Sequence, residues 1–338
     1  MKRVFVGLSG GVDSAVTAAL LKKEGADVVG VFIKGWYPPG MPCTWAADRR
    51  DAMRVAAALG IPFHTLDASE EYKRGVIDYL LAEYKAGRTP NPDIMCNREV
   101  KFGAFYRFAK EKGADQIATG HYAQTKDGHL FRGKDASKDQ SYFLWAVPQE
   151  ALADTLFPLG GMEKSETRRR AEQFKLPVAT KKDSQGICFL GSISVEDFLR
   201  TEFGSEEGKA VDEKGEEIGT HDGVLLHTLG SRIALKDAPP GPWYVVSKHV
   251  ERNLLTVSHA PATTASDPHI RLRETNWFQE PAGELLAQYR YHGPVIAGTL
   301  SADRMYFIPT EPLTEPIATG QSLVIYNDSE CIGGGIIS

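Results

Sequence analysis

A turn rich in glycine and serine near the amino terminus has residue types suited to binding phosphate. It runs from Gly7 to Ser14, reads GLSGGVDS, and lies between a predicted strand and a predicted helix. Glycines let a backbone approach a ligand closely, and the start of a helix points N–H groups at an anion. Neither a Walker A pattern nor G-x-G-x-x-G is present. We therefore interpret this turn as a phosphate loop.

Two other interpretations of the same turn stay open. Gly7-x-Ser9-x-Gly11 matches the nucleophile elbow of serine hydrolases, with Ser9 as nucleophile, in the strand–turn–helix context that this motif requires. The turn could also be a plain connection. The additional Gly10 and the following Asp13 fit a phosphate cradle better than an elbow.

A first candidate for thiol chemistry is Cys96, in a proline-stiffened loop that leads into a helix predicted over 99–112. A helix start favours a thiolate and lowers the pKa of a thiol. Asp93, three residues earlier, has the chemistry of a general acid or base. The alternative is a helix-capping aspartate with an inert, buried cysteine.

A second candidate thiol is Cys188, in a glycine-containing loop that follows Lys181 and Lys182. Nearby positive charge suits a reactive cysteine. The alternative is a small apolar residue packed between Ile187 and Phe189.

Several polar residues have the types that contact RNA. His121 follows a predicted strand, at the edge where doubly wound folds bind ligands. Arg290 and Tyr291 pair a cation with a stacking surface. The Lys138-Asp139-Gln140 run could bind phosphate and base edges, or form a solvated turn. For the Arg168–Arg170 run, phosphate binding and a solvated helix stay equally open.

Strands alternate with helices in the first half of the chain. The apolar pattern predicts strands over 3–8, 27–33, 63–66 and 116–119, and helices over 12–24, 46–59, 69–85 and 99–112. This alternation is typical of a doubly wound parallel sheet, so the fold class is α/β.

After about residue 201 the pattern changes to short β-rich runs. We expect strands over 224–229, 243–247, 254–258, 270–274, 285–291, 295–300, 305–307 and 322–326. Their spacing indicates small sandwiches or barrels. The predicted domains are 1–203, 204–266 and 267–338.

Composition excludes several classes of protein. A formal charge of −5 over 338 residues excludes a wholly basic nucleic-acid-binding surface. A basic segment remains, with seven Lys or Arg and two Glu between 164 and 182. The four cysteines form no C-x-x-C pair, so neither a zinc site nor a disulfide framework is indicated. No apolar run approaches membrane-helix length. We expect a soluble, cytoplasmic protein that does not associate with membranes.

The sequence SGGVDS after the first strand resembles the PP-loop ATP pyrophosphatases, which adenylate a substrate oxygen and release pyrophosphate. Further segments narrow the resemblance to the bacterial tRNA-specific 2-thiouridylases. These are NPDIMCN, GHYA, KDQSYFL, SQGICF and the carboxyl-terminal CIGGGII, in that family's order over essentially the whole chain.

This resemblance implies a PP-loop domain, a small β-rich central domain and a carboxyl-terminal β-barrel. It also implies ATP-dependent 2-thiolation of the wobble uridine of tRNA. Cys96 would be the nucleophile, Cys188 the persulfide carrier and Asp93 the acid or base. The implied ATP-binding residues are Gly7, Leu8, Ser9, Gly10, Gly11, Val12, Asp13, Ser14, Ile33 and Gly120. The implied tRNA-binding residues are Asn91, Pro92, Asp93, His121, Lys138, Asp139, Gln140, Arg290, Tyr291 and Gln321.

ATP with Mg²⁺ is the expected co-substrate, without a permanently bound metal or prosthetic group. The expected partners are tRNA and a sulfur-relay protein or cysteine desulfurase that loads the persulfide. The alternatives are an amide-forming PP-loop ligase, which needs no cysteine pair, a serine hydrolase that uses Ser9, and an RNA-binding module without catalysis.

Overall fold

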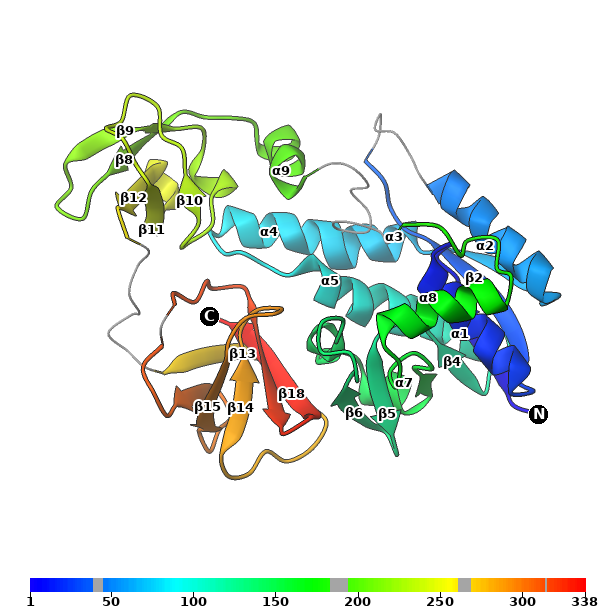
Figure 1. The fold of residues 1–338 in the computed structure, drawn as a ribbon. Helices are drawn as coiled ribbons and strands as arrows, with labels where there is room; N and C mark the ends of the chain where they lie inside the picture. The colour runs from blue at the N-terminus through cyan, green and yellow to red at the C-terminus, as the bar shows by residue number, and fades with distance from the viewer. Residues whose placement is uncertain (39–44, 183–193, 261–268, 314) are drawn as a thin grey trace.

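The computed structural model describes the chain except residues 39–44, 183–193, 261–268 and 314 (Figure 1). Its strands form three sheets. The first is parallel, with strand order β3-β2-β1-β4-β7, and the other two are built mainly from the β-rich part of the chain. The expected α/β architecture followed by β-rich domains is confirmed.

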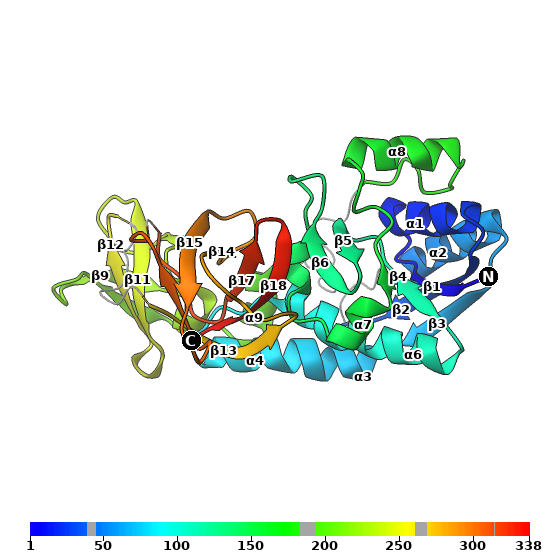
Figure 2. The same cartoon turned by 90° about the horizontal axis from the view of Figure 1, so that it is seen from below.

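The parallel sheet is covered by helices on both faces, as Figure 2 shows. Val4 and Val6 of β1 pack with α1 and α2, whereas Phe5 packs with the helices of the opposite face. Burial on both faces is what a doubly wound sheet requires. The strands are β1 (Arg3–Gly7), β2 (Asp27–Lys34), β3 (Phe63–Asp67), β4 (Gln116–Ala118) and β7 (Thr155–Leu156). Helices α1 (Val12–Lys23), α2 (Trp45–Leu59) and α8 (Lys164–Gln173) lie on one side.

Two long helical runs cover the other side, and each contains a π-helical stretch. The first consists of α3 (Ser69–Tyr72), η1 (Lys73–Asp78) and α4 (Tyr79–Lys85). The second consists of α5 (Pro92–Met95), η2 (Cys96–Ala104) and α6 (Phe105–Glu111). The runs pack closely, because a Cβ added to Gly75 of η1 would lie 2.6 Å from Cγ of Glu99 in η2. The shorter helical elements of this region are η3 (Ser141–Leu144) and α7 (Gln149–Ala153).

The second sheet is small, with strand order β10-β11-β12-β8-β9. It follows α9 (Val195–Phe203), which is joined to it by an ion pair between Arg200 and Asp222. Its elements are β8 (Gly208–Val211), β9 (Glu217–His221), β10 (Arg232–Ile233), β11 (Trp243–His249), η5 (Val250–Arg252) and β12 (Leu254–Ser258).

The strand expected over 224–229 is wrong. Val224–Leu226 form a 3₁₀ turn, η4, after Gly223, whose φ is +139°. The Val224 N–H donates to Oδ1 of Asn253 at 3.0 Å, so this apolar run is held as a turn rather than paired in a sheet. A short apolar run has no periodicity that separates these two outcomes.

The third sheet closes into a six-stranded barrel, because β13 pairs with both β16 and β18. Glycines in β18 permit the close packing: a Cβ on Gly334 would lie 2.5 Å from the carbonyl oxygen of Leu323. The barrel strands are β13 (Ile270–Trp277), β14 (Leu285–Gln288), β15 (Val295–Leu300), β16 (Tyr306–Pro309), β17 (Ser322–Asn327) and β18 (Glu330–Ile337).

A hairpin from the first half of the chain extends this barrel sheet. It consists of β5 (Ala123–Lys126) and β6 (His129–Arg132), and β6 pairs antiparallel with β18. His129 Nδ1 lies 2.5 Å from Oε1 of Glu330 across the junction. The hairpin thus ties the first predicted domain to the third, although the division at residues 203 and 266 itself stays a prediction. Among the described helices, none is long and apolar enough to cross a membrane.

Candidate functional site

A cavity of about 470 Å³ opens at the carboxyl edge of the parallel sheet. Doubly wound folds place their ligands at this edge. The turn after β1, the ends of β2 and β4, and η2 all line the cavity, and Tyr291 of the barrel region reaches it. The fold therefore gathers segments that are far apart in the sequence around one space.

The turn after β1 is braced from within by its two serines. Ser14 Oγ accepts a hydrogen bond from the Ser9 N–H at 3.2 Å, and Ser9 Oγ accepts one from the Gly11 N–H at 3.3 Å. Gly10 has φ +77°, and a Cβ there would lie 2.4 Å from the carbonyl oxygen of Asp48. Only glycine fits that position without a shift. Of the implied ATP-binding residues, all except Gly10 line the cavity.

The end of β4 meets the start of α1 without an intervening side chain. A Cβ on Gly120 would lie 2.8 Å from the backbone nitrogen of Ser14. Gly120 therefore lets these two segments approach closely where the first turn of α1 presents its N–H groups.

Lysines give the cavity a positive lining. Lys101, Lys138, Lys164 and Lys182 line it, and Asp13 is the one carboxylate among its described lining residues. That carboxylate is already paired, because Lys164 Nζ donates to its two oxygens at 2.7 and 2.8 Å. Such a cavity suits a ligand with several negative charges.

Lys181, which precedes the loop of Cys188 in the sequence, is hydrogen-bonded to the phosphate loop. Lys181 Nζ donates to the carbonyl oxygen of Gly10 at 3.1 Å and to the carboxylates of Asp48 and Asp51 at 2.9 and 2.8 Å. Arg168 donates to the carbonyl of Lys181, which gives this member of the arginine run an internal role. Cys188 itself, like Cys43, lies outside the described residues.

Cys96 is 5% exposed and lines the cavity. Its helix begins at Pro92 instead of at the predicted Glu99, because Asn91 caps it: Asn91 Oδ1 accepts from the Asp93 N–H at 3.1 Å. Asn91 and Pro92 thus build the helix start. Cys96 lies one turn inside it, where the helix dipole acts less strongly on a thiol than at the first residues.

The π-helical stretch η2 changes which residues share the face of Cys96. A π-helix, with i→i+5 hydrogen bonds, holds more residues per turn than an α-helix, so a residue five places on comes closer to the face of the first. Lys101 therefore follows Cys96 on the cavity side, and both line the cavity. Sequence reasoning missed Lys101, because α-helical spacing places residues three or four apart on one face.

Asp93 lies one turn before Cys96 and does not line the cavity. Burial raises the pKa of its carboxyl above the ordinary value, and the charge of Lys101 opposes that rise. His121 does line the cavity, 2.7 Å from Oγ1 of Thr119 through Nδ1 and packed against Phe102 and Phe157. Burial lowers the pKa of His121 well below its ordinary value, so its ring is neutral at pH 7.

The remaining residues with implied RNA contacts divide into two groups. Lys138, Gln140 and Tyr291 line the cavity, and the Tyr291 ring centroid lies 4.5 Å from that of Phe143. Arg290 is exposed and faces elsewhere, with Nη2 2.5 Å from Oε2 of Glu315. The guanidinium and the aromatic ring therefore face different surroundings, and the RNA contacts of both residues stay predictions.

Asp139 and Gln321 have internal partners. The buried carboxylate of Asp139 accepts hydrogen bonds from the N–H groups of Gly133 and Ser141 and from Arg132. Gln321 Nε2 donates to the carbonyl oxygen of Thr89 at 2.6 Å. Both residues hold loops beside the cavity, and their RNA contacts stay predictions.

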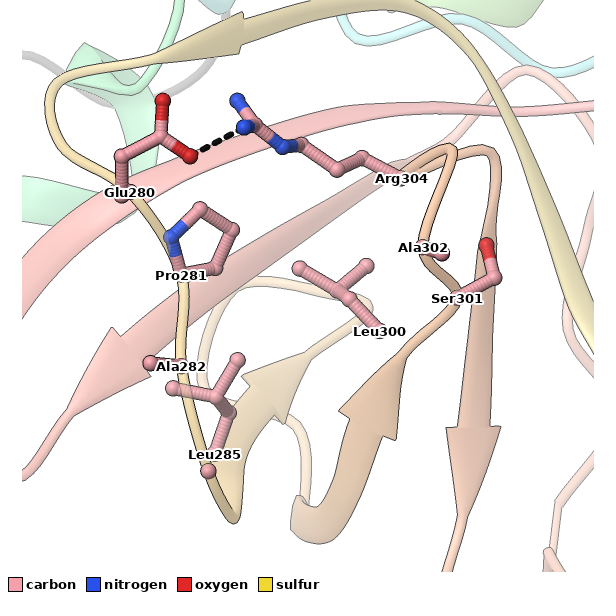
Figure 3. Close-up of a pocket in the computed structure, with 9 residues that line it drawn as sticks. Glu280, Pro281, Ala282, Leu285, Leu300, Ser301, Ala302 and Arg304 are labelled. Carbon is pink, nitrogen blue, oxygen red and sulfur yellow. Dashed lines mark hydrogen bonds and ion pairs between the residues drawn. The ribbon is translucent and has the colours of Figure 1, made fainter.

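Other residues of chemical interest lack the partners of a catalytic site. Ser9 Oγ has no hydrogen bond to a histidine or carboxylate within the described chain, as a hydrolase elbow would need. Cys331 is fully buried, and burial raises the pKa of its thiol to about 12. No group of three or more metal-ligating side chains occurs among the described residues. A second cavity, of about 200 Å³, lies on the barrel between residues 280–285 and 300–304 and shares no residue with the first (Figure 3).

Sequence reasoning also missed Lys164 and Tyr122 as lining residues. Both residues could have been singled out from the sequence, since Lys164 is the first residue of the basic segment and Tyr122 belongs to the GHYA motif. Their pairing with Asp13 could not be predicted, because the Tyr122 O–H that donates to Asp13 Oδ1 at 3.0 Å lies 109 residues along the chain.

Comparisons with known proteins cover nearly the whole chain. Family models described as tRNA methyl transferase HUP domain, tRNA methyl transferase PRC-barrel domain and Aminomethyltransferase beta-barrel domain match residues 2–192, 196–259 and 267–337. The chain is 44% identical to the tRNA-specific 2-thiouridylase MnmA of Escherichia coli O1:K1 / APEC, over 99% of this chain and 96% of that protein. It is 43% identical to the enzyme of the same name from Streptococcus agalactiae serotype III, over 99% and 95%.

Among solved structures, NMN synthetase from Francisella tularensis overlaps 59% of this chain and 71% of its own. Its TM-score is 0.38 at 20% identity, too low to support any inference. The two sequence relatives carry the assignment: the chain belongs to the tRNA-specific 2-thiouridylase family.

Proposed function

We propose that this chain is a tRNA uridine 2-sulfurtransferase that uses ATP to replace the C2 oxygen of the wobble uridine by sulfur. The observation that carries this proposal is one cavity lined by both the phosphate loop and Cys96. An amide-forming ligase has use for the loop but none for the thiol. A module that only binds RNA has use for neither.

ATP is needed because the C2 oxygen of uracil is a poor leaving group. In the proposed first step this oxygen attacks the α-phosphorus of ATP and pyrophosphate leaves. The phosphate loop and the lysine-rich lining would hold the triphosphate, accompanied by Mg²⁺. The uracil would then carry AMP, a good leaving group.

Sulfur would arrive as a persulfide on Cys188. Its terminal sulfur attacks C2 and displaces AMP, which leaves the uracil joined to Cys188 through a disulfide. The Cys96 thiolate then attacks the Cys188 sulfur, so 2-thiouridine departs with the electron pair and the two cysteines form a disulfide. A thiol reductant, and then a sulfur-relay protein or cysteine desulfurase, must restore the persulfide.

Neighbouring residues have defined parts in this scheme. Asp93, whose pKa is raised by burial, is the proposed acid or base near the nucleophile. Neutral His121 would lie beside the uracil, and Tyr291 would offer it a ring. A cytoplasmic location is part of the same proposal.

The test incubates the purified chain with unmodified tRNA, ATP and a labelled sulfane donor. We expect AMP and thiolated RNA to form together, and neither product without tRNA and ATP. Thiolated RNA without AMP, or ADP and phosphate as the main products, would overturn the adenylation step. Unlabelled tRNA beside ample AMP would instead favour a ligase.

A further inference from the structure

The segment that leads to Cys96 is fastened to the barrel. After α4 ends at Lys85, residues 86–91 run to the start of α5, and Cys96 follows one turn later. Glu83 in the last turn of α4 forms an ion pair with Arg273 of β13, and Thr89 in the connection accepts a hydrogen bond from Gln321 in the turn before β17. Cys96 thus depends on a part of the chain more than 170 residues away.

The centre of this attachment is Glu83, a carboxylate only 5% exposed. Its Oε1 accepts from Nη2 of Arg88 at 2.6 Å, and its Oε2 accepts from Nε of Arg88 at 2.8 Å. Arg273 of β13 donates to the same Oε2 at 2.6 Å. Burial raises the pKa of Glu83, but the two guanidinium groups outweigh burial and hold it below the ordinary value. The carboxylate is therefore ionised and joins the connection to the barrel.

A second set of contacts adjoins the first. The Thr89 N–H donates to the carbonyl oxygen of Thr319 at 2.8 Å, and the Thr89 carbonyl accepts from Gln321 at 2.6 Å. Between them Gly320, with φ +89°, packs so closely that a Cβ would lie 2.9 Å from the Thr89 nitrogen. We call Glu83, Arg88, Thr89, Arg273 and Gln321 the Glu83 clamp.

The residues between the clamp and Cys96 are held by further hydrogen bonds. Asn91 caps the helix two residues after Thr89. On the far side of Cys96, Nδ2 of Asn97 donates to the Phe143 carbonyl at 2.9 Å. A displacement at the clamp must therefore move or loosen the helix start that carries the thiol.

We propose that Glu83 is a positioning residue, through which the barrel sets the place of Cys96 in the cavity. The catalytic meaning of this position rests on the proposed function. The effect of Glu83 on the position of Cys96 does not rest on that function, because the accessibility of the Cys96 thiol can be measured without tRNA or ATP.

The chain supplies a matched control in another of its attachments to the barrel. There β6 pairs with β18, and His129 lies 2.5 Å from Glu330. This pair also joins the first half of the chain to the barrel, but it has no contact with residues 86–91. Glu330→Gln therefore weakens barrel attachment without touching the clamp.

The experiment compares Glu83→Gln, Arg273→Gln, Arg273→Lys and Glu330→Gln in the full chain. Iodoacetamide labelling of Cys96 and Cys331 is followed by peptide mass spectrometry, together with ATP affinity, kcat and KM for tRNA. For Glu83→Gln we expect labelling of Cys96 to rise about fivefold or more and kcat to fall about tenfold, since the charge that draws Arg88 and Arg273 together is lost and the helix start is held less firmly. ATP affinity should not change, and Arg273→Lys should retain part of the wild-type behaviour.

Labelling of Cys96 that rises while kcat falls, without a change at Cys331, distinguishes a displaced Cys96 from an unfolded chain. Fully buried Cys331 reports unfolding, so its labelling should stay at the wild-type level. Wild-type labelling of Cys96 in Glu83→Gln, an equal response in Glu330→Gln, or a parallel rise at Cys331 would each overturn the proposal. If Glu83→Gln does not fold, Arg273→Gln, which keeps the Glu83–Arg88 pair, decides by the same criteria. If Cys96→Ala still thiolated RNA, the proposed function would fail while the labelling result stood.

Discussion

The two ends of the cavity are built in different ways. The phosphate end consists of consecutive residues, and its bracing hydrogen bonds join Ser9, Gly11 and Ser14 within one turn. The Cys96 end is assembled from η2, the end of β4 and Tyr291, and its approach is held by the barrel. Hydrogen bonds within one turn brace the first end, to which Lys181 and Gly120 add contacts, whereas the second end exists only in the complete fold.

Because the two ends are built from different segments, we expect ATP binding and the reaction of the Cys96 thiol to respond to different substitutions. Substitutions in the turn after β1 should change ATP affinity and leave the Cys96 thiol unaffected. Substitutions around Cys96 should change the reactivity of its thiol and leave ATP affinity unaffected. The predictions below test that separation, beginning with the largest expected effect.

Cys96→Ala should abolish thiolation, because no other described thiol lines the cavity. ATP affinity should stay at the wild-type value, since Cys96 and the phosphate loop lie in different segments. Thiolated RNA and ATP binding are measured on the same preparation. Cys331→Ala, which alters a buried barrel residue, is the control and should retain thiolation. A Cys96→Ala enzyme that still thiolates tRNA would refute the assigned role.

Gly10→Ala should weaken ATP binding by about tenfold or more, because strain at such a backbone position is of order 1–3 kcal/mol. The added Cβ would lie 2.4 Å from the Asp48 carbonyl oxygen, at a φ of +77°. Calorimetric titration with ATP measures the loss. Gly161→Ala is the matched control, since a Cβ there meets nothing within 4 Å. Unchanged ATP affinity in Gly10→Ala would show that the turn does not hold the nucleotide.

Tyr291→Ala should lower tRNA affinity by about tenfold, because a base stacked on an aromatic ring contributes roughly 1–3 kcal/mol. Arg290→Ala should change affinity less than about threefold, because its guanidinium lies outside the cavity and is already paired with Glu315. A salt titration of tRNA binding compares the two variants. A larger loss in Arg290→Ala would place the RNA on the outer surface of the barrel instead.

The alternation of strands and helices predicted the parallel sheet, since the strands expected over 3–8, 27–33, 63–66 and 116–119 each match an observed strand to within one residue. These strands are short, apolar and bounded by turns, so their pattern is local. The hairpin of β5 and β6 escaped prediction, because its partner β18 lies about 200 residues away. The pairing, rather than the pattern of residues 123–132, makes this segment a strand pair.

In the site, too, local features could be predicted from the sequence and long-range contacts could not. The turn after β1 was predictable because its glycines and serines do their work within eight residues. The position of Lys101 beside Cys96 was not, because it depends on a π-helical register that a single chain's spacing does not reveal. The internal partners of Gln321 and Asp139 depend on tertiary contacts, which neither the resemblance that assigns Gln321 to RNA nor the residue type of Asp139 reveals.

The smallest expected effect concerns the stability of the Cys96 end. Burial raises the pKa of Asp93, so the folded chain binds this proton more tightly than the unfolded chain does. The resulting stability is present below the ordinary value of 3.8 and is lost as the pH rises through the raised pKa. Above that raised pKa the ionised carboxylate therefore destabilises the fold.

Asp93→Asn should accordingly raise Tm at pH 7 by a small amount, although it should lose thiolation, and the gain should shrink as the pH is lowered towards 3.8. Lys101 opposes the effect of burial on this carboxyl, so Lys101→Met should lower Tm at pH 7. In the Asp93→Asn background the same substitution should cost less, because the charge that Lys101 stabilises has gone. Thermal unfolding of the four proteins between pH 4 and 8 measures the coupling. A lower Tm for Asp93→Asn at pH 7 would mean that Asp93 is held by stronger partners than Lys101, and the Cys96 end would then be a stabilised structure like the phosphate end rather than one strained for reaction.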